Sequence, residues 1–177
     1  MKKFELTTES ITFLGRKLFR IKALISFGDV EAGELGGYIE KEGNLSHEGN
    51  AWVYDNAWVY DNAEVYGNAW VYGNARVSGD ARVSGNAEVY GNAEVYDNAW
   101  VCGDADIATI SGFGSEYRTT TFFRTKNDEI AVKCGCFYGT LAEFREKVKK
   151  KHGDNRYAKE YLMIADLMEM HFRGEEE

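Results

Sequence analysis

The chain has 177 residues, of which 44% are hydrophobic, and it carries a formal net charge of -8. This length is enough for one or two small domains with a hydrophobic core. No apolar run approaches the roughly 18 to 20 residues that cross a bilayer, and no apolar segment of a secretory signal follows the first lysines. The 3 cysteines do not suit a disulfide framework. These features predict a cytoplasmic protein without membrane contact and with reduced thiols.

The negative charge is concentrated in one segment. Residues 49–108 have 2 basic and 9 acidic side chains, a net charge of -7, whereas residues 109–177 have 12 of each. A negative surface repels the phosphates of nucleic acids. We therefore expect no direct contact with DNA or RNA.

Residues 1–36 precede any repeat and contain two β-rich runs, SITFL and KLFRIKALI, separated by the turn-forming pair Gly15 and Arg16. They predict a β-hairpin. An open end of a repeating β-structure offers an unpaired edge for aggregation, so we expect this hairpin to cover that end.

A strict six-residue repeat follows, with ten units from Gly49 to Ala108 that begin GNAWVY and end GDADIA. Alanine and valine recur two and then four residues apart, which predicts short strands joined by turns rather than a helix. Alanine and valine then point inward, and Gly, Asp and Asn form the corners. Three units make one triangular turn of the coil. The looser segment before them predicts a coil over 37–108, with Ile39 and Leu45 in the alanine position.

Two stretches of sequence support this architecture by resemblance. The pattern Val-x-Gly-Asn-Ala-x resembles the hexapeptide repeat of left-handed β-helix proteins. The stretch FGDVEAGELGG, at residues 27–37, resembles the opening of the YdcK family, and that likeness extends over residues 18–108. The resemblance implies a left-handed β-helix. It implies little about chemistry, because the transferase activity of that family is inferred from its fold.

The 18-residue turn predicts which outward side chains are stacked on neighbouring turns. Two faces place an arginine between a tryptophan and a glutamate, which permits cation–π and ion-pair contacts. The first two turns of the remaining face are aromatic and uncharged, which predicts either a subunit interface or the floor beneath the C-terminal module. The candidate binding residues are Trp52, Tyr54, Trp70, Tyr72 and Tyr90 on this first face, Trp58 and Arg76 on the second, and Arg82 and Trp100 on the third.

The period stops after residue 108, and residues 109–177 predict a ββαα module. Two strands flank the turn at 126–128, one helix extends from Thr140 to Gly153, and a second covers residues 155–172. The string beginning Cys134-Gly-Cys136 is similar to uncharacterised modules of phage and gut-bacterial proteins.

Catalytic chemistry is poorly represented. Hexapeptide acyltransferases use a histidine base and a loop extending from the coil, but no loop interrupts residues 49–108, and His47 is the only candidate base. His152 suits a favourable contact with a helix C-terminus. Cys134 and Cys136 lack accompanying ligands, so we interpret them as buried structural thiols without a metal. We expect no cofactor.

The sequence therefore predicts a mainly β protein: a hairpin cap, a left-handed β-helix and a C-terminal α+β module. The leading hypothesis for function is a non-catalytic binding or scaffold protein that forms a homo-oligomer, with a trimer favoured. A phage-encoded version acts in counter-defence by sequestering a host ligand or blocking a host protein. The basic cluster at Lys147 and 149–151 either solvates its helix or holds a small anionic ligand. The alternatives are a coenzyme A-dependent acyltransferase and an acidic nucleic-acid mimic, although Arg76 and Arg82 interrupt the acidic surface.

Overall fold

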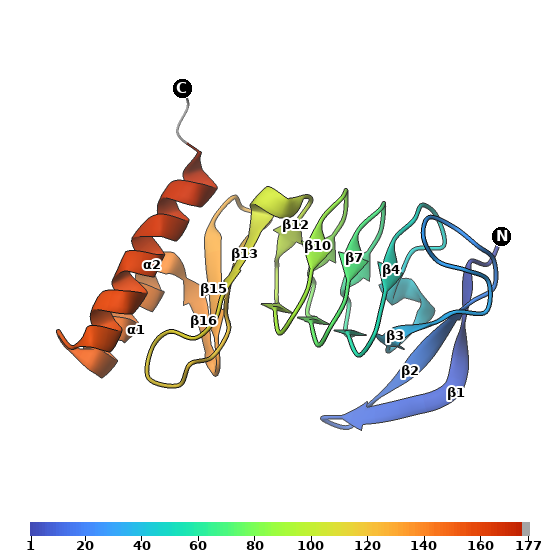
Figure 1. The fold of residues 1–177 in the computed structure, drawn as a ribbon, viewed down its shortest axis with the longest axis horizontal. Helices are drawn as coiled ribbons and strands as arrows, with labels where there is room; N and C mark the ends of the chain where they lie inside the picture. The colour runs from blue at the N-terminus through green and yellow to red at the C-terminus, as the bar shows by residue number, and fades with distance from the viewer. Residues whose placement is uncertain (175–177) are drawn as a thin grey trace.

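A computed structural model describes residues 1–174. The molecule is elongated, with a hairpin at one end, a coil in the middle and an α+β module at the other end (Figure 1). No helix among the described residues is long and apolar enough to span a membrane.

The repeats form a β-solenoid of about 4 turns. The first nine units each contribute a strand of two residues, and each of these strands pairs in parallel with a strand one turn away. Three sheets result, and they are the three faces that the 18-residue spacing predicts. The handedness of the coil stays a prediction. The strands are β4 (Trp52–Val53), β5 (Trp58–Val59), β6 (Glu64–Val65), β7 (Trp70–Val71), β8 (Arg76–Val77), β9 (Arg82–Val83), β10 (Glu88–Val89), β11 (Glu94–Val95) and β12 (Trp100–Val101).

The inward positions are confirmed. Every alanine from Ala51 to Ala99 and every valine from Val53 to Val101 in the repeat positions is buried in one core. The corners need a left-handed backbone, and a Cβ added at Gly85 would lie 2.0 Å from the carbonyl oxygen of Cys102 on the next turn. Glycine at that corner therefore allows the turns to stack closely.

The predicted placement of Ile39 and Leu45 in the alanine position is wrong. Ile39 pairs with Val59, and Leu45 bridges to Val65, so both occupy valine positions. Gly37 instead lies next to the alanine row, where an added Cβ would meet the carbonyl oxygen of Ala57 at 2.6 Å. Both side chains are buried in the same core as Phe4 and Ile21 of the N-terminal strands.

The N-terminal residues form the predicted hairpin, with β1 (Phe4–Phe13) antiparallel to β2 (Arg16–Ala23). Strand β2 pairs with β3 (Leu35–Ile39), which pairs with β5, so the hairpin extends the second face of the coil. The base of the hairpin also contributes Phe4 and Ile21 to the coil core. A short 3-10 helix, η1 (Glu42–Asn44), follows β3.

The C-terminal module has four strands before its helices, not the two that we predict from sequence. They form an antiparallel sheet in chain order: β13 (Ile107–Ile110), β14 (Thr120–Arg124), β15 (Ile130–Cys134) and β16 (Phe137–Thr140). A 3-10 helix, η2 (Asp104–Asp106), precedes them. Strand β13 crosses the expected boundary at residue 108, because the last repeat unit, GDADIA, leaves the coil and pairs with β14.

The two predicted helices are confirmed as α1 (Leu141–His152) and α2 (Arg156–Arg173). Thr140 caps α1, and Glu143 completes the capping box. One face of the sheet places Phe123 and Ala131 against the end of the coil, and the other places Phe122 and Val132 against the helices. The module therefore closes the second end of the solenoid, and its helices lie beyond the sheet (Figure 1).

Candidate functional site

The first face of the coil divides into a covered part and an open part. Trp52 and Trp70 pair on adjacent turns, as the repeat predicts. Trp52 is nevertheless 0% exposed, because Phe27 meets its ring edge to face at 5.3 Å and Phe4 packs at 6.2 Å. The expectation that Trp52 lies at a subunit interface or beneath the C-terminal module is therefore wrong. The N-terminal segment covers it.

An open groove of about 490 Å³ lies where this cover ends. The rings of Tyr54 and Trp70 meet at 5.7 Å with planes 70° apart, so they form the two walls of a corner. Tyr72 stacks on the exposed ring of Tyr90 at 5.5 Å. The lining of the groove is completed by three carboxylates, those of Asp29, Asp55 and Glu88.

Each carboxylate enters the groove from a different segment. Asp29 belongs to the loop between β2 and β3, and Asp55 occupies a left-handed corner of the coil, where it accepts a hydrogen bond from the Gly73 amide at 3.1 Å. Glu88 lies one turn beyond Trp70 and accepts a hydrogen bond from the Tyr72 hydroxyl at 2.8 Å. Coil contacts thus hold Asp55 and Glu88 in place, and the described residues that line the groove include no basic side chain.

Burial and these carboxylates act on both tyrosine hydroxyls in the same direction. Burial, followed by the hydrogen bond to Glu88 and its charge, raises the pKa of Tyr72 to about 12. Burial, and then the charges of Glu34 and Asp29, raise the pKa of Tyr54. Both phenols are therefore neutral donors at physiological pH, and the potential over the groove is negative.

The second face contains a smaller groove of about 340 Å³ between the hairpin tip and the C-terminal sheet. Arg76 lies over the ring of Trp58 at 4.5 Å and over Phe13 at 5.3 Å, and pairs with Glu94 at 3.8 Å. Lys133, from β15, also pairs with Glu94 at 3.2 Å. These contacts join the hairpin, the coil and the module, which is a structural use of the predicted cation–π column.

On the third face, Arg82 pairs with Glu64 at 3.5 Å. Trp100 pairs with Arg82 on the adjacent turn and is 42% exposed. Cys102 follows on this face and is exposed. Neither Arg82 nor Trp100 lines the grooves of the other two faces.

His47, the candidate base, packs against the N-terminal cover, the segment whose residues Phe4 and Phe27 lie over Trp52. Its ring stacks on Phe4 at 4.3 Å, its Nδ1 accepts a hydrogen bond from the Lys3 amide at 3.2 Å, and its Nε2 is buried 3.8 Å from Glu42. The arrangement fixes the ring between the cap and the coil. His152 ends α1, as predicted, and His171 is exposed near the end of α2.

The cysteines differ from the prediction of buried thiols. Cys134 ends β15 and is half-buried, with its Sγ accepting a hydrogen bond from the Thr120 hydroxyl at 3.2 Å. Cys136 lies in the following turn and is exposed, because Gly135 leaves the strand with a positive φ. In the part of the chain that the structure describes, no three His, Cys, Asp or Glu side chains gather as metal ligands.

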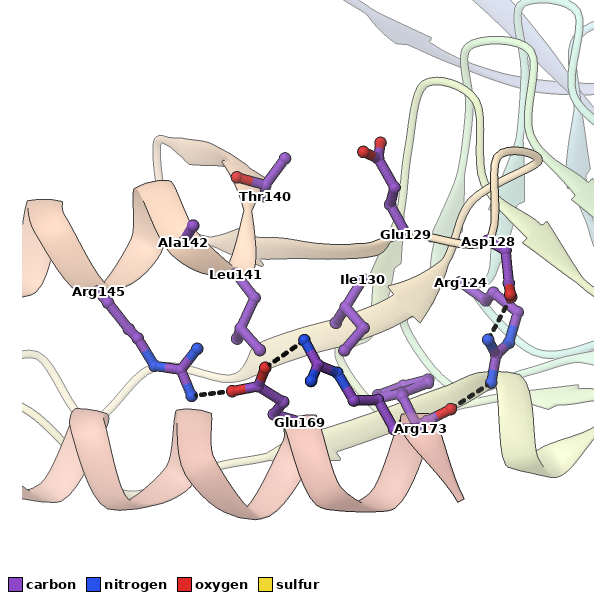
Figure 2. Close-up of a pocket in the computed structure, with 11 residues that line it drawn as sticks. Arg124, Asp128, Glu129, Ile130, Thr140, Leu141, Ala142, Arg145, Glu169 and Arg173 are labelled. Atoms are coloured by element: carbon purple, nitrogen blue, oxygen red, sulfur yellow. Dashed lines mark hydrogen bonds and ion pairs between the residues drawn. The ribbon is translucent and has the colours of Figure 1, made fainter. Parts of the chain in front are cut away.

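A third cavity, of about 420 Å³, lies in the C-terminal module and contains several charged groups (Figure 2). Figure 2 shows Arg145 and Arg173 on either side of Glu169. Each guanidinium lies 2.6 Å from the Glu169 carboxylate. Arg124 donates to the main-chain carbonyl of Phe172 at 2.6 Å. Because these guanidinium groups already have partners, the cluster attaches the end of α2 to the sheet.

The repeats match the family model described as the YdcK Beta solenoid repeat, at residues 63–79, 69–85 and 75–89. The chain contains YdcK-type solenoid repeats. The resemblance predicted over residues 18–108 is therefore confirmed for residues 63–89. No curated protein matches the chain. The match ends at residue 89, so the likeness of the C-terminal module to phage and gut-bacterial modules stays a prediction.

Sequence reasoning missed the residues that shape the groove from outside the repeats. Asp29 forms part of its lining, and Phe27 and Phe4 set its border by covering Trp52. None of these residues has a position in the six-residue period. The signal available was the FGDVEAGELGG stretch at residues 27–37, whose predicted resemblance to YdcK proteins lies outside the family match and which has no periodicity that assigns it to a face.

Proposed function

We propose that this protein is a non-catalytic binding protein whose solenoid is a rigid support for the groove of the first face. The observation that carries the proposal is the groove itself: aromatic walls, fixed carboxylates and an open side. Aromatic residues of this kind contribute strongly to binding when a partner removes them from water.

The geometry of His47 favours binding over acyl transfer. A general base must reach the proton that it removes, whereas the Nδ1 of His47 accepts a hydrogen bond from the Lys3 amide and its Nε2 is buried near Glu42 of η1. Fold analogy alone supports the acyltransferase alternative. The nucleic-acid mimic is less well supported, because aromatic rings rather than regularly spaced charges line the groove.

The expected homo-oligomer, with a trimer favoured, is retained as part of the proposal, as are the phage-encoded version and the blocking of a host protein. In each version, partners bind the faces of the solenoid, because both of its ends are covered. A scaffold of this shape carries one copy of the groove on each subunit.

The test is native mass spectrometry of freshly purified protein, which reports subunit number and any retained molecule together. The parent is compared with Trp70→Glu and with Trp100→Glu, a matched control on the third face. We expect Trp70→Glu to lose the bound partner or the self-association, while Trp100→Glu keeps it. Equal behaviour of all three proteins would contradict a role for the groove. Turnover of acetyl-coenzyme A by the parent that is lost in His47→Ala would instead support the acyltransferase alternative.

A further inference from the structure

The three faces of the coil repeat one chemical pattern, with one element missing on the first face. On the second face, an arginine lies between tryptophan and glutamate: Arg76 is flanked by Trp58 and Glu94. On the third face, Arg82 is flanked by Glu64 and Trp100. The first face has Trp52, Trp70 and Glu88 on three successive turns, so a second tryptophan occupies the middle position where the other two faces have arginine, and the face has no cation of its own.

From this comparison we infer that the first-face groove binds a cationic side chain, lysine or arginine, of a partner protein. The inference rests on the proposed function and specifies its ligand. On the second face, the chain's own guanidinium lies 4.5 Å from the tryptophan ring and 3.8 Å from the glutamate. In the first-face groove the same two kinds of group, ring and carboxylate, are open to a group from outside.

The shape of the groove suits a cation on a long apolar stem. The corner formed by Tyr54 and Trp70 offers ring surface for the methylene groups of lysine or arginine, as such stems commonly lie along apolar surface. A cation over an aromatic face is attracted by the ring quadrupole. The carboxylates of Asp29, Asp55 and Glu88 lie around the same groove, where the charged end is neutralised.

The charge of the surroundings reinforces this selectivity. The groove is lined by three acidic side chains and, among the described residues, no basic one, and Asp104 adds a further negative charge close to Tyr72. Residues 49–108 as a whole have a net charge of -7. An anionic partner is repelled by this surface, whereas a basic segment of a protein is attracted to it.

A side chain of a protein fits better than a free small ion for a geometric reason. The groove is open along one side and its volume of about 490 Å³ exceeds what one ammonium group fills. The remaining space along the rings accommodates the stem and the backbone from which it projects. The occupant is therefore a basic segment on the surface of a partner protein.

The experiment is an NMR titration of the four tryptophan indole N–H signals, assigned by single Trp→Phe variants. The probes are the Nα-acetyl amides of arginine, lysine and norleucine, of which norleucine has the stem of lysine without its charge. We expect arginine and lysine to shift the Trp70 signal saturably and to leave Trp52 and Trp100 unchanged. Norleucine binds about tenfold more weakly, and added salt weakens the cationic probes only.

Variants separate charge from shape. Glu88→Gln keeps an acceptor for the Tyr72 hydroxyl but removes a charge, so it weakens the binding of arginine and lysine without changing that of norleucine. Glu146→Gln, at an exposed position on α1, is the matched control and leaves all three unchanged.

Two outcomes overturn the inference. Equal binding of norleucine and lysine shows that the groove recognises apolar surface only, and the proposed binding function then survives without the cation. No saturable shift of Trp70 with any probe contradicts a side-chain site. In that case the native mass spectrometry of the Trp70→Glu protein decides the proposed function independently.

Discussion

Trp52 and Trp70 occupy the same repeat position on adjacent turns, yet they have different environments. Trp52 is 0% exposed under Phe4 and Phe27, whereas Trp70 forms a wall of the open groove. The two residues have equivalent positions in the coil, since both project outward from paired strands. The difference comes from the N-terminal segment, which covers one turn and stops before the next. In this protein the repeats supply a uniform surface, and non-repeating segments determine which part of it is available.

The largest effect is expected from a substitution at an inward position of the coil, Val71, which directly follows Trp70. Val71→Asp places an unpaired carboxylate in the coil core, where Val71 is fully buried. Burial of such a charge costs several kcal/mol against a total stability of roughly 5 to 15 kcal/mol, so the variant should unfold the coil. Thermal melting followed by circular dichroism measures this, and a melting temperature close to that of the parent would refute the inward assignment.

The next largest effect is the difference between the two tryptophans in their contribution to the free energy of unfolding. Trp52→Ala should lower the free energy of unfolding by about 3 to 5 kcal/mol, because it empties a fully buried site. Trp70→Ala should lower it by about 1 kcal/mol or less, since its ring is already partly in water. Chemical denaturation of both variants gives the comparison. Similar losses for the two would mean that the N-terminal cover does not exist in solution.

Removal of the cover should make the exposure of Trp52 to water more similar to that of Trp70. Phe27→Ala deletes the ring that meets Trp52 at 5.3 Å, and we expect a loss of about 1 to 3 kcal/mol together with increased access of water to Trp52. The fluorescence emission of a protein with Trp52 as its single tryptophan should move to longer wavelength. Unchanged emission would place the covering contact elsewhere, and Phe113→Ala, an exposed site in the C-terminal module, is the control.

A smaller, pH-dependent effect concerns the lysine beneath the same cover. Lys3 is buried, donates to the carbonyls of Gly49 and Ala51, and has its pKa lowered by burial from 10.5 to about 8. Between pH 8 and pH 10 the unfolded chain holds this proton more tightly than the folded one, so stability rises with pH. The expected rise from Lys3 alone is about 2 kcal/mol. Denaturation midpoints should show it in the parent but not in Lys3→Met, and equal pH dependence would exclude Lys3 as its source.

The buried tyrosines act in the opposite direction. Burial raises the pKa of Tyr72 and Tyr161, each to about 12, so the folded state holds their protons more tightly. Their contribution to stability is present below the ordinary tyrosine value of 10.0 and is lost as the pH rises toward 12. Because Lys3→Met keeps these tyrosines, the difference between the two proteins isolates Lys3.

The coil was predictable because a strict period fixes both the inward positions and the pairing between turns. The helices were predictable from their caps, as Thr140 with Glu143 shows. Strands β13 and β16 were not predictable. Strand β13 begins with the last two residues of a repeat unit, and these residues pair with β14 instead of with the coil. Sequence spacing alone gives no indication of that exchange.

The candidate site was predictable only in part. The placement of Tyr54, Trp70 and Tyr72 on one face follows from the repeat, but the placement of Asp29 beside them does not. That contact depends on how the loop between β2 and β3 folds back over the first turn, where Phe27 and Val30 pair with each other. A non-periodic loop has no spacing rule that connects it to one of three faces.

The most direct measurement is fluorescence quenching of single-tryptophan proteins by caesium and iodide ions at equal ionic strength. Trp52 alone and Trp70 alone are retained in turn, with phenylalanine at the other tryptophan positions. The structure predicts that neither ion quenches Trp52 and that caesium quenches Trp70 more strongly than iodide, because carboxylates surround its groove. Quenching of Trp52 as strong as that of Trp70, or stronger quenching of Trp70 by iodide, would contradict a covered first turn beside an open, cation-selective groove.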